Sequence, residues 1–287
     1  MRASRNAIIV AAVVAIVGIL ISGAIAGYAG RGRTPLSPGL DGTRATALNV
    51  AARRIQTSGA DAAEFLDSFR AGEPGNALNH YLLAAAYARR GGWAAATAAM
   101  QDGNRAPHCL NYADPLPFVR DRTAVSIVRT LREEFEDAAL SRPGAEAGKA
   151  LHEGRIMATR IARADPPSLY ALEAGVSLRH GIAQATGNLA QKAGEDWRTD
   201  LARQEEKADA VFLRKVRAER QALFGTGGAL HPDRLREKYG LTEADAAALA
   251  AGEPPPDADR RTQEAIAAEW DAAERAAVSR LLSQMPD

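Results

Sequence analysis

The sequence predicts an all-α protein with an apolar N-terminal helix, a short tether and an irregular helical bundle. Aromatic residues make up only 5% of the chain, so the core must be built mainly from Leu, Val, Ile and Ala. Such a core suits closely packed helices better than a β-sandwich. Beyond the N-terminal segment, no alternating apolar and polar run reaches the length of a strand. Gly and Pro instead fall between Ala-rich, charge-dotted segments, as they do at helix ends.

Residues 1–29 carry the strongest local signal, because no charged residue occurs from Ala7 to Tyr28. These 22 residues would extend about 33 Å as a helix, enough to cross a hydrocarbon core of about 30 Å. We therefore predict a transmembrane signal anchor that crosses the lipid bilayer through residues 7–28. Gly23 and Gly27 form a GxxxG pair, which makes them candidates for packing between two transmembrane helices.

A cleaved signal peptide is the alternative interpretation of this segment. Arg2 and Arg5 would form its positive region, and the stretch from Ala24 to Ala26 fits a cleavage site. An uncleaved anchor is favoured because the apolar run continues through that site and Arg31 follows it. A short flank before a large body is typical of a bacterial signal anchor, so we expect a single-pass inner-membrane protein with a periplasmic body.

The body is predicted to follow a flexible linker over residues 30–42, which contains Pro, Gly and Ser and has no apolar period. We divide it into a helical domain over residues 43–224 and a C-terminal helical extension over residues 225–287. The predicted helices cover residues 43–57, 61–70, 77–90, 93–104, 118–140, 145–164, 169–191, 196–223, 233–239, 242–251 and 259–283.

The segment 196–223 is long and charged, and it carries an approximate apolar stripe. The stripe includes Trp197, Leu201, Ala208, Val211 or Phe212, Val216 and Leu223. It indicates either a coiled-coil arm for a partner helix or the rim of the same domain.

A helical hairpin is predicted between Tyr81 and Met100, where two Ala-rich stretches flank Gly91 and Gly92. The segment resembles a tetratricopeptide repeat through Leu83, Ala84, Tyr87, Gly91, Trp93, Ala96 and Met100. It departs from the pattern at Gly103, where the family has Ala, and at Pro107, which lies one residue early. The resemblance covers about a tenth of the chain and implies a concave surface that holds a peptide or helix. Candidates for partner binding or for packing within the hairpin are Leu83, Tyr87, Trp93 and Met100.

The charge distribution argues against nucleic-acid binding. The net charge is +1, but four arginines precede the first acid, Asp41, and leave 32 basic against 35 acidic residues in the remainder. Such a body lacks the basic footprint that nucleic acid requires. A single cysteine, Cys109, allows no disulfide within the chain.

Several fragments imitate catalytic or binding motifs without completing them. The stretch at His152 begins like HExxH, but Ile156 stands where the second zinc ligand belongs. The stretch at Gly225 begins like GxGxxG, but Leu230 replaces the last glycine. The five histidines lie far apart in the sequence. We therefore predict no catalytic residue, metal site or cofactor.

These features predict a membrane-anchored, non-enzymatic adaptor or scaffold of the bacterial envelope that binds a protein partner. The alternative is an enzyme or small-ligand binder whose site is assembled only in three dimensions. A homo-oligomer is a third hypothesis, formed through Gly23 and Gly27 and through the 196–223 helix.

Overall fold

The fold is known from a computed structural model, which describes residues 67, 70–71, 73–110, 131–132, 134–135, 144–165, 167–251 and 255–286. This part of the chain contains eight α-helices and no β-strand, so the all-α prediction is confirmed there. The helices are α4 (Ala77–Arg89), α5 (Trp93–Arg105), α7 (Gly144–Ala162), α8 (Leu169–Lys192), α9 (Asp196–Phe224), α10 (Pro232–Tyr239), α11 (Glu243–Ala251) and α12 (Arg260–Leu282).

The ends of these eight helices lie within two residues of the predicted ends, because local capping groups fix many of them. The Asn76 side chain accepts a hydrogen bond from the Leu78 amide at 3.1 Å and begins α4. Ser168 caps α8 in the same way. Gly240 ends α10 in the left-handed conformation, with φ of 65°, which glycine adopts without steric cost.

Several predictions fall outside the described residues. They are the membrane span over residues 7–28 with Gly23 and Gly27, the linker over residues 30–42, the helix over residues 43–57, and most of those over residues 61–70 and 118–140. In the part of the chain that is described, none of the helices combines the length and the apolar composition needed to cross a bilayer.

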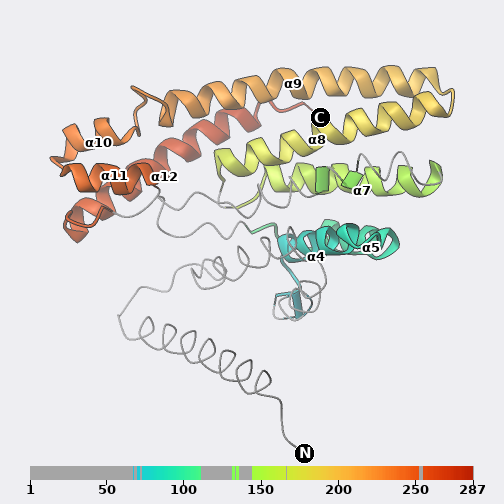
Figure 1. Cartoon of the computed structure of the whole chain (residues 1–287), viewed down its shortest axis with the longest axis horizontal. Coiled ribbons are helices and arrows are strands. Elements are labelled where there is room, and N and C mark those ends of the chain that lie inside the picture. The colour runs from blue at the N-terminus through green and yellow to red at the C-terminus, as the bar shows by residue number, and fades with distance from the viewer. Residues whose placement is uncertain are drawn as a thin grey trace, which may run out of the picture.

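The longest helices pack as successive layers (Figure 1). Helices α8 and α9 form an antiparallel pair, α7 packs on α8, and α5 packs on α7. Gly175 allows the close approach of α8 to α7, because a Cβ atom there would lie 2.4 Å from the Ala162 backbone nitrogen and 2.5 Å from the Ala158 carbonyl oxygen. Helix α12 lies against α8 and α9, while α10 and α11 lie at one end.

Three apolar clusters hold these layers together. The first joins α4, α5, α7 and α8 and includes Leu131 and Phe135 from the segment before α7. The second joins α8, α9 and the C-terminal part of α12, and the third joins α10 to α12 with Leu223 and Phe224. Side chains from both predicted domains thus share the second cluster, while the boundary at residue 224 stays a prediction.

Candidate functional site

The hairpin residues that resemble a tetratricopeptide repeat lie mostly in the core. Leu83, Trp93 and Met100 are buried, and Tyr87 is half-buried against the same cluster. The Trp93 ring lies 5.4 Å from the Phe135 ring, centroid to centroid, at an angle of 52°. These side chains therefore pack the hairpin against its neighbours, and they expose little apolar surface.

A polar network joins the hairpin to α7. The buried Tyr81 hydroxyl donates to the Asn104 side-chain oxygen at 2.9 Å, and the Asn104 amide donates to Glu153 Oε2 at 2.7 Å. Arg160 donates to the carbonyl oxygens of Asn104 and Ala106, at 2.7 and 2.6 Å, where α5 ends. Burial raises the pKa of the Tyr81 phenol, so this hydroxyl remains a donor. The network is structural, because each of these hydrogen bonds joins or ends helices.

Neither the Cys109 thiol nor a histidine forms a recognisable catalytic pair among the described residues. Burial raises the pKa of the Cys109 thiol to about 12, which leaves little thiolate at neutral pH. His80 Nε2 lies 2.9 Å from the Pro74 carbonyl oxygen, and His180 Nδ1 lies 3.2 Å from the Glu206 carbonyl oxygen. Within the described ranges, no three His, Cys, Asp or Glu side chains gather in a way that could hold a metal ion.

A buried ion pair fixes α9 to α8. The Arg179 guanidinium donates to both carboxylate oxygens of Asp209, at 2.7 and 3.3 Å, and both side chains are less than 5% exposed. The same guanidinium donates to the Pro286 carbonyl oxygen at 2.8 Å and so holds the C-terminal segment. A bidentate, hydrogen-bonded pair restricts the rotation of both side chains. The rotational setting of α9, and hence the face that it turns outward, is fixed by this contact.

The outward face of α9 carries an unusual set of exposed apolar side chains. Trp197 is 69% exposed, Leu201 49% and Val211 46%. Among the described residues, only Ile156 on α7 is a further large hydrophobic residue with more than a third of its surface exposed. The three residues belong to a heptad series that we name the outer α9 stripe: Trp197, Leu201, Gln204, Ala208, Val211 and Lys215.

The structure separates two faces that the predicted stripe had combined. Phe212 and Val216 point into the second apolar cluster, whereas Trp197, Leu201 and Val211 face outward. The inward face makes α9 the rim of the described bundle, and the outward face remains uncovered by the other described helices. Burying a side chain of the size of Leu or Val is worth about 1.5–3 kcal/mol, so this uncovered face retains apolar surface that a contact could remove from water.

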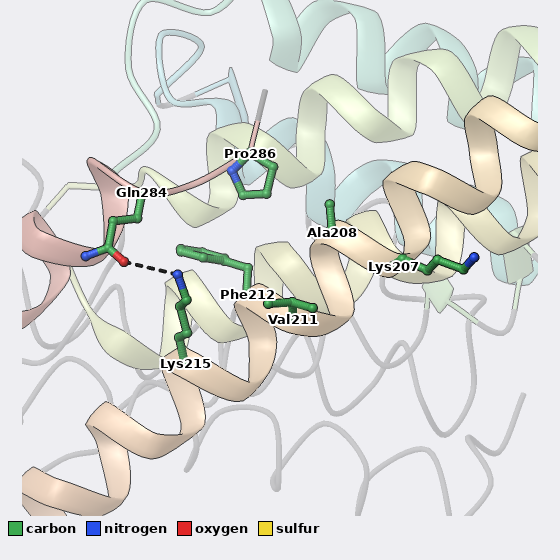
Figure 2. Close-up of a pocket in the computed structure, with 7 residues that line it drawn as sticks. All are labelled: Lys207, Ala208, Val211, Phe212, Lys215, Gln284 and Pro286. Carbon is green, nitrogen blue, oxygen red and sulfur yellow. Dashed lines mark hydrogen bonds between the residues drawn. The ribbon is translucent and has the colours of Figure 1, made fainter.

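A shallow pocket lies beside the outer α9 stripe, between α9 and the C-terminal segment (Figure 2). The residues that line it are Lys207, Ala208, Val211, Phe212, Lys215, Gln284 and Pro286. Lys215 Nζ donates to Gln284 Oε1 at 3.3 Å across it. The pocket widens the apolar surface around Val211.

Charged side chains border the outer α9 stripe in an ordered way. Asp196 and Asp200 are exposed near the start of α9, and Lys207 and Arg214 are exposed further along it. In the described structure, Asp200, Lys207 and Arg214 make no ion pair with another residue. Along the flank formed by Asp200, Lys207 and Arg214, the stripe therefore runs from an acidic end to a basic end.

The outer α9 stripe is thus the candidate functional site, because it alone among the features above presents both apolar and charged groups to the outside. No sequence motif marks it, although its heptad spacing can be read from the residues. Comparison of the chain with known protein families, with curated proteins and with solved structures finds no significant match.

Proposed function

We propose that this protein is a membrane-anchored adaptor or scaffold of the bacterial envelope that binds a protein partner through the outer α9 stripe. The observation that carries the proposal is the exposure of Trp197, Leu201 and Val211 at heptad spacing on a helix whose other face is already packed. A helix that presents apolar residues at this spacing is suited to pack against another helix.

The surroundings of the stripe support the same function. The Arg179–Asp209 pair holds α9 in one orientation, so the stripe is a rigid surface. The apolar segment over residues 7–28 would hold the body at the bilayer, with the linker over residues 30–42 between them. The body would then stand on the periplasmic side of the inner membrane.

Cross-linked capture from gently solubilised membranes tests the proposal. The full chain carries a C-terminal tag and is expressed together with a copy that carries a different tag, so that self-association is scored beside other partners. A triple variant, Trp197→Ser, Leu201→Ser and Val211→Ser, is compared with Ile156→Ser, which removes an exposed apolar side chain from α7. We expect the triple variant to lose a stoichiometric partner that the wild type and the Ile156→Ser variant retain.

Equal capture by all three proteins, with circular dichroism showing each to be folded, would refute a role for the stripe. The anchor is tested separately by deleting residues 7–28. The deletion should move the chain from the alkali-resistant membrane fraction to the supernatant, and its retention in the membrane fraction would refute the anchor.

A further inference from the structure

We infer that the partner on the outer α9 stripe is the same stripe of a second copy of the chain, packed antiparallel about a two-fold axis near Glu206. The inference rests on the proposed function, because it takes the stripe to be an interaction surface. It names the partner that the stripe fits and the register in which the two helices meet.

The apolar residues of the stripe are complementary to their own antiparallel copy. In an antiparallel coiled coil the two core positions of each heptad face each other across the interface. Placing the axis near Glu206 sets Leu201 opposite Val211 of the second copy and Gln204 opposite Ala208 of the second copy. Because a two-fold contact is reciprocal, each pair occurs twice. A large residue thus meets a smaller one in each of these layers, which suits side-chain interdigitation.

The two ends of the outer α9 stripe are also complementary to each other in this register. Trp197 lies opposite Lys215 of the second copy in the same register. Trp197 is 69% exposed, and Lys215 extends beside the pocket and reaches Gln284. The aliphatic stem of a lysine can lie on an indole ring with its ammonium in water, and the charge is attracted to the ring face. The outermost layers of the pairing therefore cover the most exposed aromatic ring of α9.

The charges favour a second copy in this orientation. The positions that flank the stripe bring Asp200 opposite Arg214 of the second copy, and symmetry makes two such pairs. All four of these groups are exposed and make no ion pair within the described chain. A parallel pairing would instead set Asp200 opposite Glu205 of the second copy, which repels. It would also set Arg214 opposite Glu219, which is already paired with Arg280 of its own chain.

Two like-charge contacts remain in the antiparallel pairing, and one is Glu205 against Glu205 of the second copy, where each carboxylate is already paired with Arg155 of its own chain. Lys207 meets Lys207 of the second copy near the axis, where both ammonium groups reach water and are screened by salt. Two attractive pairs, one screened repulsion and one contact between acids that are already paired favour the antiparallel over the parallel arrangement, in which Asp200 has an acid opposite it. Helix α9 forms an outer layer of the described bundle (Figure 1), and the helices that it packs against are α8 and α12. Its outward side is therefore free of these helices.

Directed disulfide formation between full-length chains in detergent tests the register. Cys109 is replaced by Ala, and two differently tagged chains are co-expressed, one with Leu201→Cys and one with Val211→Cys. We expect oxidation to produce a disulfide dimer that carries both tags, because a disulfide needs Cα atoms within about 7 Å. A second mixture, Gln204→Cys with Ala208→Cys, should give the same product one layer closer to the axis.

The Leu201→Cys variant on its own distinguishes an antiparallel from a parallel pairing. Two Leu201 positions would lie about 15 Å apart along an antiparallel dimer, so Leu201→Cys alone should give no more dimer than Ile156→Cys on α7. Efficient dimerisation of Leu201→Cys alone would establish a parallel pairing and overturn the inference. Absence of a two-tag dimer in both mixtures would overturn it also.

The failure of this inference can be told apart from the failure of the proposed function. If the triple serine variant loses another protein while no two-tag dimer forms, the stripe binds a different partner and only the second copy is refuted. If the capture experiment shows no dependence on the stripe and no two-tag dimer forms, both proposals fail.

Discussion

Two tryptophans show how differently two regions of this molecule use the same kind of pattern. Trp93 begins α5 and is 6% exposed, whereas Trp197 lies near the start of α9 and is 69% exposed. Both are followed by small or apolar residues at helical spacing. The repeat-like hairpin is the region that the sequence most readily offers as a binding surface, yet its large side chains are in the core.

The difference arises from what lies next to each helix. Phe135, from the segment before α7, covers Trp93, and α7 covers the other side of α5. Helix α9 has α8 and α12 on one side and forms an outer layer of the described bundle. Amphipathic spacing therefore identifies an apolar face of a helix. Whether that face is buried within the chain depends on the elements that pack beside the helix.

Truncating each tryptophan to alanine tests the difference between the two regions most directly. Trp93→Ala should reduce the free energy of unfolding by about 3–5 kcal/mol, because it removes a large buried ring and leaves a cavity. At chain concentrations low enough to keep the protein monomeric, Trp197→Ala should change it by less than about 0.5 kcal/mol, since little of its ring is buried within the chain. Urea unfolding of the full chain in detergent, followed by circular dichroism, measures both values. Similar losses for the two variants would contradict the assignment of one ring to the core and the other to the surface.

The rotational orientation of α9, which determines the side chains that face outward, depends on the Arg179–Asp209 pair. Arg179→Met should cost about 3 kcal/mol, because it leaves the buried Asp209 carboxylate without its cation. Burial raises the pKa of Asp209, and Arg179 opposes that rise. Without Arg179, the folded-state pKa should rise further above its unfolded value. The stability lost by the variant should therefore be greatest at neutral pH and should shrink as the pH falls and the carboxyl takes up a proton.

Unfolding of the Arg179→Met variant in urea at several pH values measures this dependence. The double variant Arg179→Met, Asp209→Leu is the control, because it removes both charges and should recover most of the stability at neutral pH. A double variant as unstable as the single one would show that packing, not an unpaired charge, accounts for the loss.

A smaller effect is expected where the hairpin meets α7. Tyr81→Phe removes the hydroxyl that donates to Asn104 and should cost about 1 kcal/mol. Tyr87→Phe is the matched control, because Tyr87 is half-buried and its hydroxyl makes no hydrogen bond with the described residues. Urea unfolding midpoints of the two variants, compared at equal slope, measure the difference. An equal loss in both would show that the network contributes little beyond the packing of the rings.

Much of the fold follows from local signals in the sequence. The capping bonds between Asn76 and Leu78 and between Ser168 and Tyr170, and the left-handed Gly240, involve residues that are close in the sequence, so the ends of these helices could be predicted closely. The ion pair between Arg179 and Asp209 could not, because it joins residues 30 apart through the packing of α8 on α9. Nothing in the order of residues marks those two charges as buried.

The candidate site was only partly predictable for a related reason. Val211 and Phe212 are adjacent, and successive helix residues point about 100° apart, so both fit an approximate stripe. The choice between them depends on α8 and α12, which bury Phe212 and leave Val211 outward. A stripe in the sequence therefore indicates that α9 has an apolar face, while the structure shows that it has two.

A further small effect is expected from the charges at the ends of the outer α9 stripe, and it concerns association of the chain, not its folding. Asp200→Arg should weaken self-association about three- to tenfold, because two attractive pairs become repulsive and each exposed pair is worth about 0.2–1 kcal/mol. Adding Arg214→Asp to the same chain restores opposite charges in the antiparallel register and should restore the wild-type dissociation constant. Analytical ultracentrifugation in density-matched detergent, at low and high salt, measures both, and the difference should shrink as salt rises. A double variant that associates no better than Asp200→Arg would show that these two residues do not face each other. The second substitution can restore an attractive pair only if position 214 lies opposite position 200 of the second copy.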